Sequence, residues 1–222
     1  MKLLAIVAAR NEVDRIGDTI DALRTAFPEA EIWVADDASS DGTASIALAR
    51  GARVVSRGRP HGKGANMTAA ATAALDRSDA ELALVCDGDL GDSAVVLAEL
   101  VEAVAEDRCD LAIAAFRRRV GGGFGVALRF ARWAIRSRSG YVAGAPISGQ
   151  RAMRVEVLRE VLPFAGGYGL EIGISVDAVR AGFRVCELEL ELEHRATGRT
   201  LGGFVHRGRQ LRDFARVWWT RR

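Results

Sequence analysis

The chain has 222 residues, 49% of them hydrophobic and 27% charged, which suits one α/β domain with a sizeable core. Its net charge of +2 excludes a protein whose whole surface is basic and binds polyanions. No run reaches the roughly 18 to 20 apolar residues that a membrane span needs.

The cysteines and the N-terminus indicate the compartment. Cys86, Cys109 and Cys186 are scattered, odd in number and form no CxxC pair, which favours a reducing compartment and argues against a disulfide framework or a structural zinc site. The opening apolar run is followed at once by charge, as in a buried strand and unlike a signal peptide. We therefore expect a cytoplasmic protein that at most touches the inner face of a membrane.

Apolar runs alternate with helical patterns through the first half of the chain. Strands are expected at residues 3–8, 31–35, 53–56, 82–86 and 111–115. The first helix is expected to follow an N-cap at Asn11, and later helices to cover residues 43–50, 64–75 and a segment from a cap near Ser93 to Ala105. This alternation predicts an α/β fold whose mostly parallel central sheet is flanked by helices.

The second half is less regular. A basic loop is expected at residues 117–123, followed by a segment at 124–138 that mixes arginine with aromatic residues. Helices are expected at 155–161 and 170–181, with a glycine-rich turn at 166–169 between them. A strand at 184–192 and a basic, aromatic helix at 209–219 complete the chain.

Acidic residues follow two of the predicted strands, at the sheet edge where open α/β folds bind ligands. Asp87-Gly88-Asp89 can share one hard divalent ion across a tight turn. Asp37 follows an earlier strand, where a carboxylate can accept hydrogen bonds from a nucleobase or a ribose; an Asp-rich helix cap and turn is the alternative there.

Lys63 lies in the run His61-Gly62-Lys63-Gly64, which offers an ammonium group before a helix N-terminus and so suits phosphate. The sequence has neither a Walker loop nor a GxGxxG after its first strand, which argues against a dinucleotide-dependent oxidoreductase.

Four segments occur in the order and spacing of family-2-type glycosyltransferases, which the chain resembles: VAARNE at 7–12, VADDASSDGT at 34–43, HGKGAN at 61–66 and CDGDL at 86–90. The resemblance implies a GT-A fold, with a Rossmann-like sheet and a smaller acceptor-side region, in one domain over residues 1–222. Residues 1–115 would bind the nucleotide sugar and 116–222 the acceptor. The implied donor-binding residues are Ala8, Arg10, Glu12, Asp37, Lys63, Asp87 and Gly88.

Position 8 departs from that family, which usually has proline where this chain has Ala8. The resemblance also implies that Asp87 takes part in catalysis and that Asp89 binds a divalent metal, Mg²⁺ or Mn²⁺.

A second resemblance, to glucosyl-3-phosphoglycerate synthases and their relatives, comes from GYGLEIG at 167–173 and from Glu193-His194-Arg195. It implies that His194 completes the metal site and that Glu171 contacts the donor sugar or acts as the base. From the residues alone, a cap at a strand end is the favoured interpretation of His194, and the motif favours the ligand. The acceptor loop of that group is matched at 121–123, but residues 124–126 read Phe-Gly-Val in place of Arg-Val-Thr, which argues against phosphoglycerate as acceptor.

The segment Ser148-Gly149-Gln150 lies in an SGQRA run similar to one found beyond the donor site in many relatives. It is expected to bind the acceptor, and a turn entering a strand is the alternative.

The predicted reaction moves a hexose from a UDP- or GDP-sugar to a polyprenyl phosphate, as in polyprenyl (dolichyl) phosphate sugar transferases, or to a small metabolite. A divalent ion held by Asp87 or Asp89 and by His194, helped by Lys63 and Arg199, would neutralise the departing diphosphate. A phosphate acceptor needs no base, whereas a hydroxyl acceptor would need Glu171. A nucleotidyltransferase is the second alternative, but the sequence lacks the GxGxR loop expected of that class after the first strand. A non-catalytic membrane-peripheral module is the third alternative.

Segments 124–138 and 207–222 combine arginines with Trp133, Trp218 and Trp219. They predict either contact with an anionic membrane or core-packing helices whose arginines reach solvent. Nucleic acid is not expected as a partner because no binding motif accompanies the arginines. A second copy of the chain is a further candidate partner.

Overall fold

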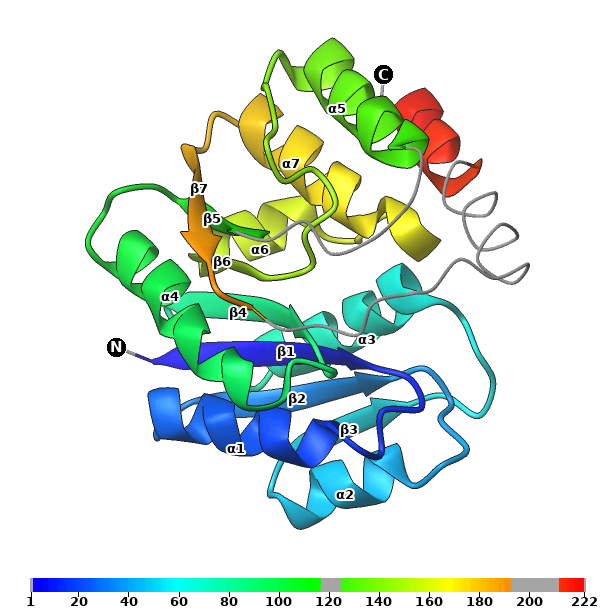
Figure 1. Cartoon of the computed structure of the whole chain (residues 1–222), viewed down its shortest axis with the longest axis vertical. Helices are drawn as coiled ribbons and strands as arrows, with labels where there is room; N and C mark the ends of the chain where they lie inside the picture. The colour runs from blue at the N-terminus through cyan, green and yellow to red at the C-terminus, as the bar shows by residue number, and fades with distance from the viewer. Residues whose placement is uncertain (1, 117–124, 193–211, 222) are drawn as a thin grey trace.

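The computed structural model describes residues 2–116, 125–192 and 212–221. Seven strands form one sheet in the order β3-β2-β1-β4-β6-β5-β7 (Figure 1). The elements are β1 (Leu3–Ala9), α1 (Ile16–Ala26), β2 (Glu31–Asp36), α2 (Thr43–Ala49), β3 (Arg53–Ser56), α3 (Lys63–Leu75), β4 (Leu82–Asp87), the 3-10 helix η1 (Gly91–Leu97), α4 (Ala98–Ala105), β5 (Leu111–Phe116), α5 (Val126–Ser139), β6 (Arg151–Arg154), α6 (Val155–Val161), the 3-10 helix η2 (Gly167–Gly169), α7 (Leu170–Arg180) and β7 (Val185–Leu190). A last helix covers residues 212–220 and is called the C-terminal helix below.

The sheet is parallel except for β6, which runs antiparallel to both of its neighbours, β4 and β5. This confirms the α/β class with a mostly parallel sheet. Side chains along β1 alternate between its two faces, because successive residues of a strand point in opposite directions. Leu3, Ala5 and Val7 pack with α1 and η1 on one face, while Leu4 and Ile6 pack with α3 on the other.

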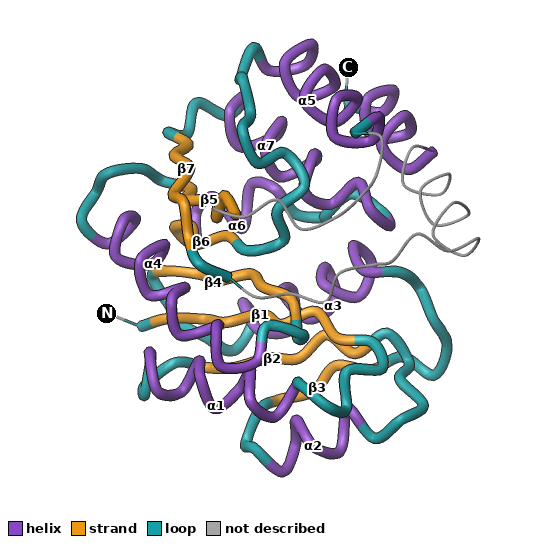
Figure 2. Tube along the Cα trace, in the orientation of Figure 1, coloured by secondary structure: helices purple, strands orange, loops and turns teal. Residues whose placement is uncertain are grey.

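Helices cover both faces of the sheet (Figure 2). A third apolar cluster lies apart from the sheet and joins α5, α7 and the C-terminal helix, which Figure 1 shows in red beside α5. Within the described residues, no helix is long and apolar enough to cross a membrane.

The pairing register brings three strand ends to one edge of the sheet. Ala8 lies opposite Asp87, and Ala9 lies opposite Asp36. The backbone hydrogen bonds between these strands continue one residue further, since Gly88 N donates to Ala8 O at 2.8 Å and Asp37 N donates to Ala9 O at 3.0 Å. The loops after β1, β2 and β4 are therefore neighbours.

Two predicted helix starts are wrong. The first helix begins at Ile16, not after Asn11, because residue 11 has a φ of 55° and its side-chain Oδ1 accepts from Ser40 N at 3.0 Å. Ser93 lies inside η1, where its hydroxyl donates to Leu90 O at 2.7 Å, so the α-helical turns begin only at Ala98. In both places a polar side chain binds a loop or the preceding turn.

The expectation against a disulfide framework is also corrected, since one pair of cysteines is bonded. Cys109 and Cys186 form a disulfide with Cα atoms 5.9 Å apart, although 77 positions separate them in the chain. The parallel pairing of β5 with β7 sets Cys186 opposite Ala112 and so next to Cys109. Cys86 is free and buried. The spacing of the cysteines in the sequence did not indicate that these two strands pair.

Candidate active site

A cleft of about 790 Å³ opens at the carboxyl ends of β1, β2 and β4. Its walls combine the loops after those strands with the N-termini of α3 and α7 and one side of the C-terminal helix. The predicted residues among them are Ala8, Arg10, Glu12, Asp37, Lys63, Asp87, Asp89 and Glu171. Residues placed far apart by the sequence thus line one cavity.

Lys63 joins the two residues predicted to be catalytic. Its Nζ lies 2.7 Å from Asp87 Oδ1 and 2.8 Å from Glu171 Oε1. Burial lowers the pKa of Lys63, but the negative charges of Asp87 and Glu171 raise it by more, so its net shift is upward from the ordinary value. The cleft therefore holds a permanent ammonium group between two carboxylates.

Asp87 is positioned by the segment at 148–150. Gln150 Nε2 donates to Asp87 Oδ2 at 2.9 Å, and Ser148 Oγ donates to Gln150 Oε1 at 3.2 Å. Gly149 lies against the ion pair, because a Cβ added there would come within 2.5 Å of Asp87 Oδ2 and 2.9 Å of Lys63 Nζ. Ser148 and Gln150 are buried beneath Asp87 and are not among the cleft-lining residues. Their acceptor-binding role stays a prediction.

Asp37 is buried and surrounded by donors from the protein. Its carboxylate accepts from the backbone N–H of His61 at 2.7 Å, from that of Gly62 at 3.2 Å and from the side chain of Asn66. Arg10 Nη1 lies 3.4 Å from the same carboxylate. Asp37 therefore fixes the loop that carries Lys63, and contact with a nucleoside stays a prediction for it.

The loop after β1 is held by the loop after β2. Backbone N–H groups of residues 11, 12 and 13 donate to Ser39 Oγ at 2.9 Å, Thr43 Oγ1 at 2.9 Å and Asp41 Oδ2 at 3.2 Å. The two loops form one rigid wall of the cleft, since each hydrogen bond ties backbone to a side chain some 30 positions away. Arg10 and Glu12 extend from this wall.

The family model for glycosyl transferase family 2 matches residues 4–162. The chain belongs to this family. A curated relative, the undecaprenyl-phosphate mannosyltransferase of Micrococcus luteus, is 30% identical over 223 residues, covering 92% of this chain and 90% of the relative.

Solved structures of one enzyme share the fold of this glycosyltransferase. Glucosyl-3-phosphoglycerate synthase from Mycobacterium tuberculosis in complex with phosphoglyceric acid has a TM-score of 0.79 at 25% identity, over 99% of this chain and 79% of the synthase. Its complex with Mn²⁺, UDP and glucosyl-3-phosphoglycerate has a TM-score of 0.77 over the same shares. The chain is therefore a GT-A glycosyltransferase.

The Asp-Gly-Asp turn of this glycosyltransferase presents carboxylate oxygens, the donors that Mg²⁺ and Mn²⁺ prefer. The turn is tight, because a Cβ on Gly88 would lie 3.0 Å from Ala8 O. Asp87 and Asp89 both line the cleft. Among the described residues, no three His, Cys, Asp or Glu side chains are grouped so that they could hold a metal ion. The donor set fits a hard cation but needs a further ligand.

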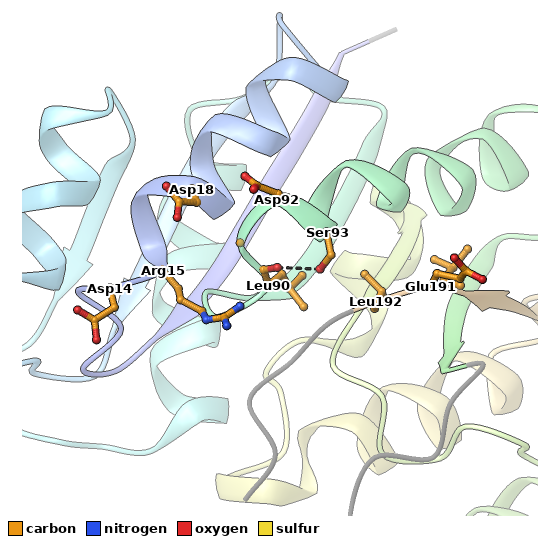
Figure 3. A pocket seen from close by; sticks show the side chains of 10 residues that line it. Asp14, Arg15, Asp18, Leu90, Asp92, Ser93, Glu191 and Leu192 are labelled. Carbon is orange, nitrogen blue, oxygen red and sulfur yellow. Dashed lines mark hydrogen bonds between the residues drawn. The ribbon is translucent and has the colours of Figure 1, made fainter.

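His194 and Arg199 lie outside the described residues, so the predicted third ligand is not placed. Leu192 is the last described residue before them, and it packs in one apolar cluster with Leu90, the neighbour of Asp89. Figure 3 shows Leu192 and Leu90 on the wall of a second cavity, of about 1100 Å³. The described part of the chain before His194 thus reaches the cavity that Leu90, the neighbour of Asp89, also lines.

Arg151 on β6 was not singled out as a site residue, although it is fully buried behind the site. Its Nε donates to Ser148 O and its Nη1 to Ser175 Oγ, both at 3.0 Å, while its Nη2 has no partner among the described residues. Burial lowers its pKa to about 10, against the opposing effect of Glu171. No apolar run surrounds Arg151 in the sequence, so no local pattern marked it as buried.

The C-terminal helix also contributes residues that sequence reasoning assigned to no site. They are Arg212, Asp213, Phe214 and Arg216, which line the same cleft as Lys63. The prediction placed this helix on a membrane or in the core and did not connect it with the strand ends. Such a contact over some 150 positions leaves no local pattern in the sequence.

Proposed function

We propose that the chain transfers a sugar from a nucleoside-diphosphate sugar, UDP- or GDP-linked, to a polyprenyl phosphate. The observation that carries the proposal is the ion pair of Lys63 with Asp87 and Glu171 inside the cleft. It supplies fixed charge of both signs in a half-buried site, which suits a reaction that separates an anionic leaving group from a sugar carbon. Residues 1–115 form the nucleotide side in this account, and 116–222 form the acceptor side.

Lys63 acts on the leaving group. Cleavage of the bond between the anomeric carbon and the phosphate oxygen leaves added negative charge on the diphosphate, and the ammonium group compensates that charge without moving. The Lys63 side chain stands at the start of α3, whose positive helix end adds to the effect. Solved complexes of the synthase contain UDP with Mn²⁺ or Mg²⁺, which supports such a donor here.

Asp89, Asp87 and His194 are the residues that would hold a divalent ion. When bound, the ion supplies further positive charge to the leaving diphosphate. We assign the metal contact to Asp89 and His194, as the resemblance implies, and Asp87 also accepts from Lys63 and Gln150.

Glu171 has a different task for each acceptor class. An acceptor phosphate is already anionic and attacks without losing a proton, so Glu171 then only orients Lys63 and the donor sugar. A hydroxyl acceptor must lose a proton, and Glu171 would take it. The 30% identity to the undecaprenyl-phosphate mannosyltransferase and the Phe-Gly-Val at 124–126 favour the phosphate acceptor.

The test is an acceptor panel with radiolabelled UDP-glucose and GDP-mannose in the presence of Mn²⁺. We expect label in the organic phase with undecaprenyl phosphate, and none with 3-phosphoglycerate. Label transferred only to phosphoglycerate would overturn the acceptor assignment. No transfer to either class, with either donor, would overturn the proposed function itself.

A further inference from the structure

The C-terminal helix is attached firmly beside the cleft. Phe214 and Val217 on its inner side are buried against α5 and α7. Arg221 Nε lies 2.6 Å from the Asp177 carboxylate, and Arg138 Nε donates to Trp218 O at 2.8 Å. Because α7 carries Glu171, these contacts fix the helix relative to the catalytic groups.

Glycines of η2 let the helix approach closely. A Cβ on Gly169 would overlap the Val217 side chain, and one on Gly167 would overlap the Asp213 carboxylate. At these two glycines the segment directly before α7 thus has no side chain where the helix passes. The helix therefore forms part of the cleft wall.

One stripe of the C-terminal helix leads from the cleft to the surface. Arg212, Arg216 and Trp219 are spaced four and three residues apart and so lie along the same side of an α-helix. Both arginines line the cleft, and Trp219 beyond them is 60% exposed. The stripe from residue 212 to residue 219 is about 10 Å long, at roughly 1.5 Å per residue.

The two arginines are available to a ligand. The Arg216 side chain makes no hydrogen bond or ion pair with any described residue, and Arg212 has only a 3.4 Å contact with the neighbouring Asp213 carboxylate. Guanidinium groups bind phosphate with paired, charge-assisted hydrogen bonds. Asp213 also lines the cleft and would reduce the affinity for an anion, so both arginines are needed to leave a net positive wall.

Exposed tryptophans continue the stripe onto α5. The ring centroids of Trp219 and Trp218 are 6.4 Å apart, and those of Trp218 and Trp133 are 5.1 Å apart. The Trp133 side chain on α5 is 49% exposed, and Arg129 and Arg136 are exposed along the same side of a helix that has no acidic residue. Exposed tryptophan with arginine and no acid is complementary to an anionic bilayer surface.

We propose that the C-terminal helix carries the acceptor site for a lipid-linked phosphate. Arg212 and Arg216 bind the phosphate inside the cleft, and Trp219 and Trp133 rest in the bilayer surface that holds its apolar chain. This inference rests on the proposed function and adds to it the residues that select the acceptor.

The first experiment tests the arginines. We expect the double variant R212Q/R216Q to raise the KM for undecaprenyl phosphate, and for water-soluble farnesyl phosphate, at least 10-fold. The thermal shift that UDP and Mn²⁺ produce should stay unchanged, because donor residues are untouched. The matched control is Arg108→Gln, an exposed arginine paired with Glu106 far from the cleft. Wild-type KM values for both acceptors in R212Q/R216Q would overturn the site.

The second experiment tests the tryptophans by vesicle flotation. The intact chain should bind phosphatidylglycerol vesicles and not phosphatidylcholine vesicles. W133S/W219S should lose this binding and turnover of vesicle-held undecaprenyl phosphate, while keeping turnover of farnesyl phosphate. Leu48→Ser is the control, since Leu48 is 58% exposed on α2. No flotation of the intact chain, or unchanged flotation of W133S/W219S, contradicts the bilayer contact.

The experiments distinguish a failure of the proposed function from a failure of the acceptor site. If the intact chain transfers sugar to no lipid phosphate at all, the proposed function is wrong. If it transfers sugar and the arginine variant does so equally well, only the acceptor site is wrong.

Discussion

Lys63 is one of two lysines in a chain that otherwise uses arginine for its positive charges, 31 basic residues in all. An ammonium group is compact and can place one charge between two carboxylates, whereas a guanidinium group is planar and wider. At 2.7 and 2.8 Å from its partners, the ammonium group fits a gap closed on one side by Gly149. The space between Asp87, Glu171 and Gly149 thus favours lysine over arginine at position 63.

Replacing Lys63 by methionine should lower kcat on the order of 100-fold or more, because the leaving diphosphate loses its fixed positive charge. Lys63→Arg should also be impaired, since the larger group must displace Asp87 or Gly149. Initial rates at saturating donor measure the effect. Lys2→Met is the matched control, because Lys2 is exposed, pairs with exposed Asp79 and is not among the residues that line the cleft. Wild-type kcat in Lys63→Met would remove Lys63 from the mechanism.

Gly149→Ala should impair catalysis while leaving the fold intact. The new methyl group would come within 2.5 Å of Asp87 Oδ2, so the carboxylate must shift. A shift of this kind at a reacting group lowers kcat/KM by roughly 10- to 100-fold. Gly58→Ala is the control, because a Cβ there meets nothing within 4 Å. Equal kcat/KM in the two variants would show that Asp87 has no fixed position.

At the scale of elements, β6 explains why the hydrogen bond from Gln150 that positions Asp87 was not predicted. The strand is four residues long, begins and ends with arginine and has no apolar run that would mark it. Its antiparallel register sets Arg151 opposite Val85, which brings Gln150 next to the end of β4. Strands β1 to β5 were predicted nearly to their ends, because four of them contain a run of at least four apolar residues and β3 has two valines at its centre. The contacts of β6 depend on a pairing that no local pattern records.

A charge cluster fixes β5, β6 and β7 at the opposite edge of the sheet. Arg184 N and Nε donate to Asp110 Oδ2 at 2.8 and 3.1 Å, and Arg154 Nε donates to Oδ1 at 3.2 Å. The hydrogen bonds from Arg184, the largest influence, lower the pKa of Asp110 to about 2. Because the folded chain favours the carboxylate, this stability is complete above the ordinary pKa and is lost as the pH falls toward 2.

Asp110→Asn should therefore lower the free energy of unfolding by about 1 to 2 kcal/mol at pH 7, after allowance for solvent screening. The difference from the wild-type chain should shrink between pH 4 and pH 2, where the carboxylate becomes protonated. Urea unfolding at pH 7, 4 and 2.5 measures it. A difference that stays constant over this range would mean that the charge of Asp110 contributes nothing.

At the scale of the whole molecule, the sequence motifs predicted the fold class and the sheet edge where residues of the loops after β1, β2 and β4 line one cleft. They succeeded because those residues lie in loops directly after apolar strands. The proposed acceptor residues Arg212 and Arg216 could not be predicted in the same way, because they reach the cleft through the packing of the C-terminal helix on α5 and α7. The metal ligand predicted at His194 stays a prediction.

Metal removal tests the assignment of the Asp-Gly-Asp turn in the intact molecule. UDP or GDP should raise the melting temperature in the presence of Mn²⁺, and EDTA should abolish most of that rise. Asp89→Asn should behave like the EDTA-treated chain, whereas Asp92→Asn, on η1 outside the donor cleft, should behave like the wild-type chain. A nucleotide-induced rise that is equal with Mn²⁺ and with EDTA would contradict a metal at this turn.

The most direct test is a crystal structure of the chain with Mn²⁺ and the nucleoside diphosphate that stabilises it. The account predicts the diphosphate in the cleft between Lys63 and Asp89, with Arg212 and Arg216 facing the space left for the acceptor. A nucleotide bound instead in the larger cavity beside Asp14 and Leu190 would contradict it.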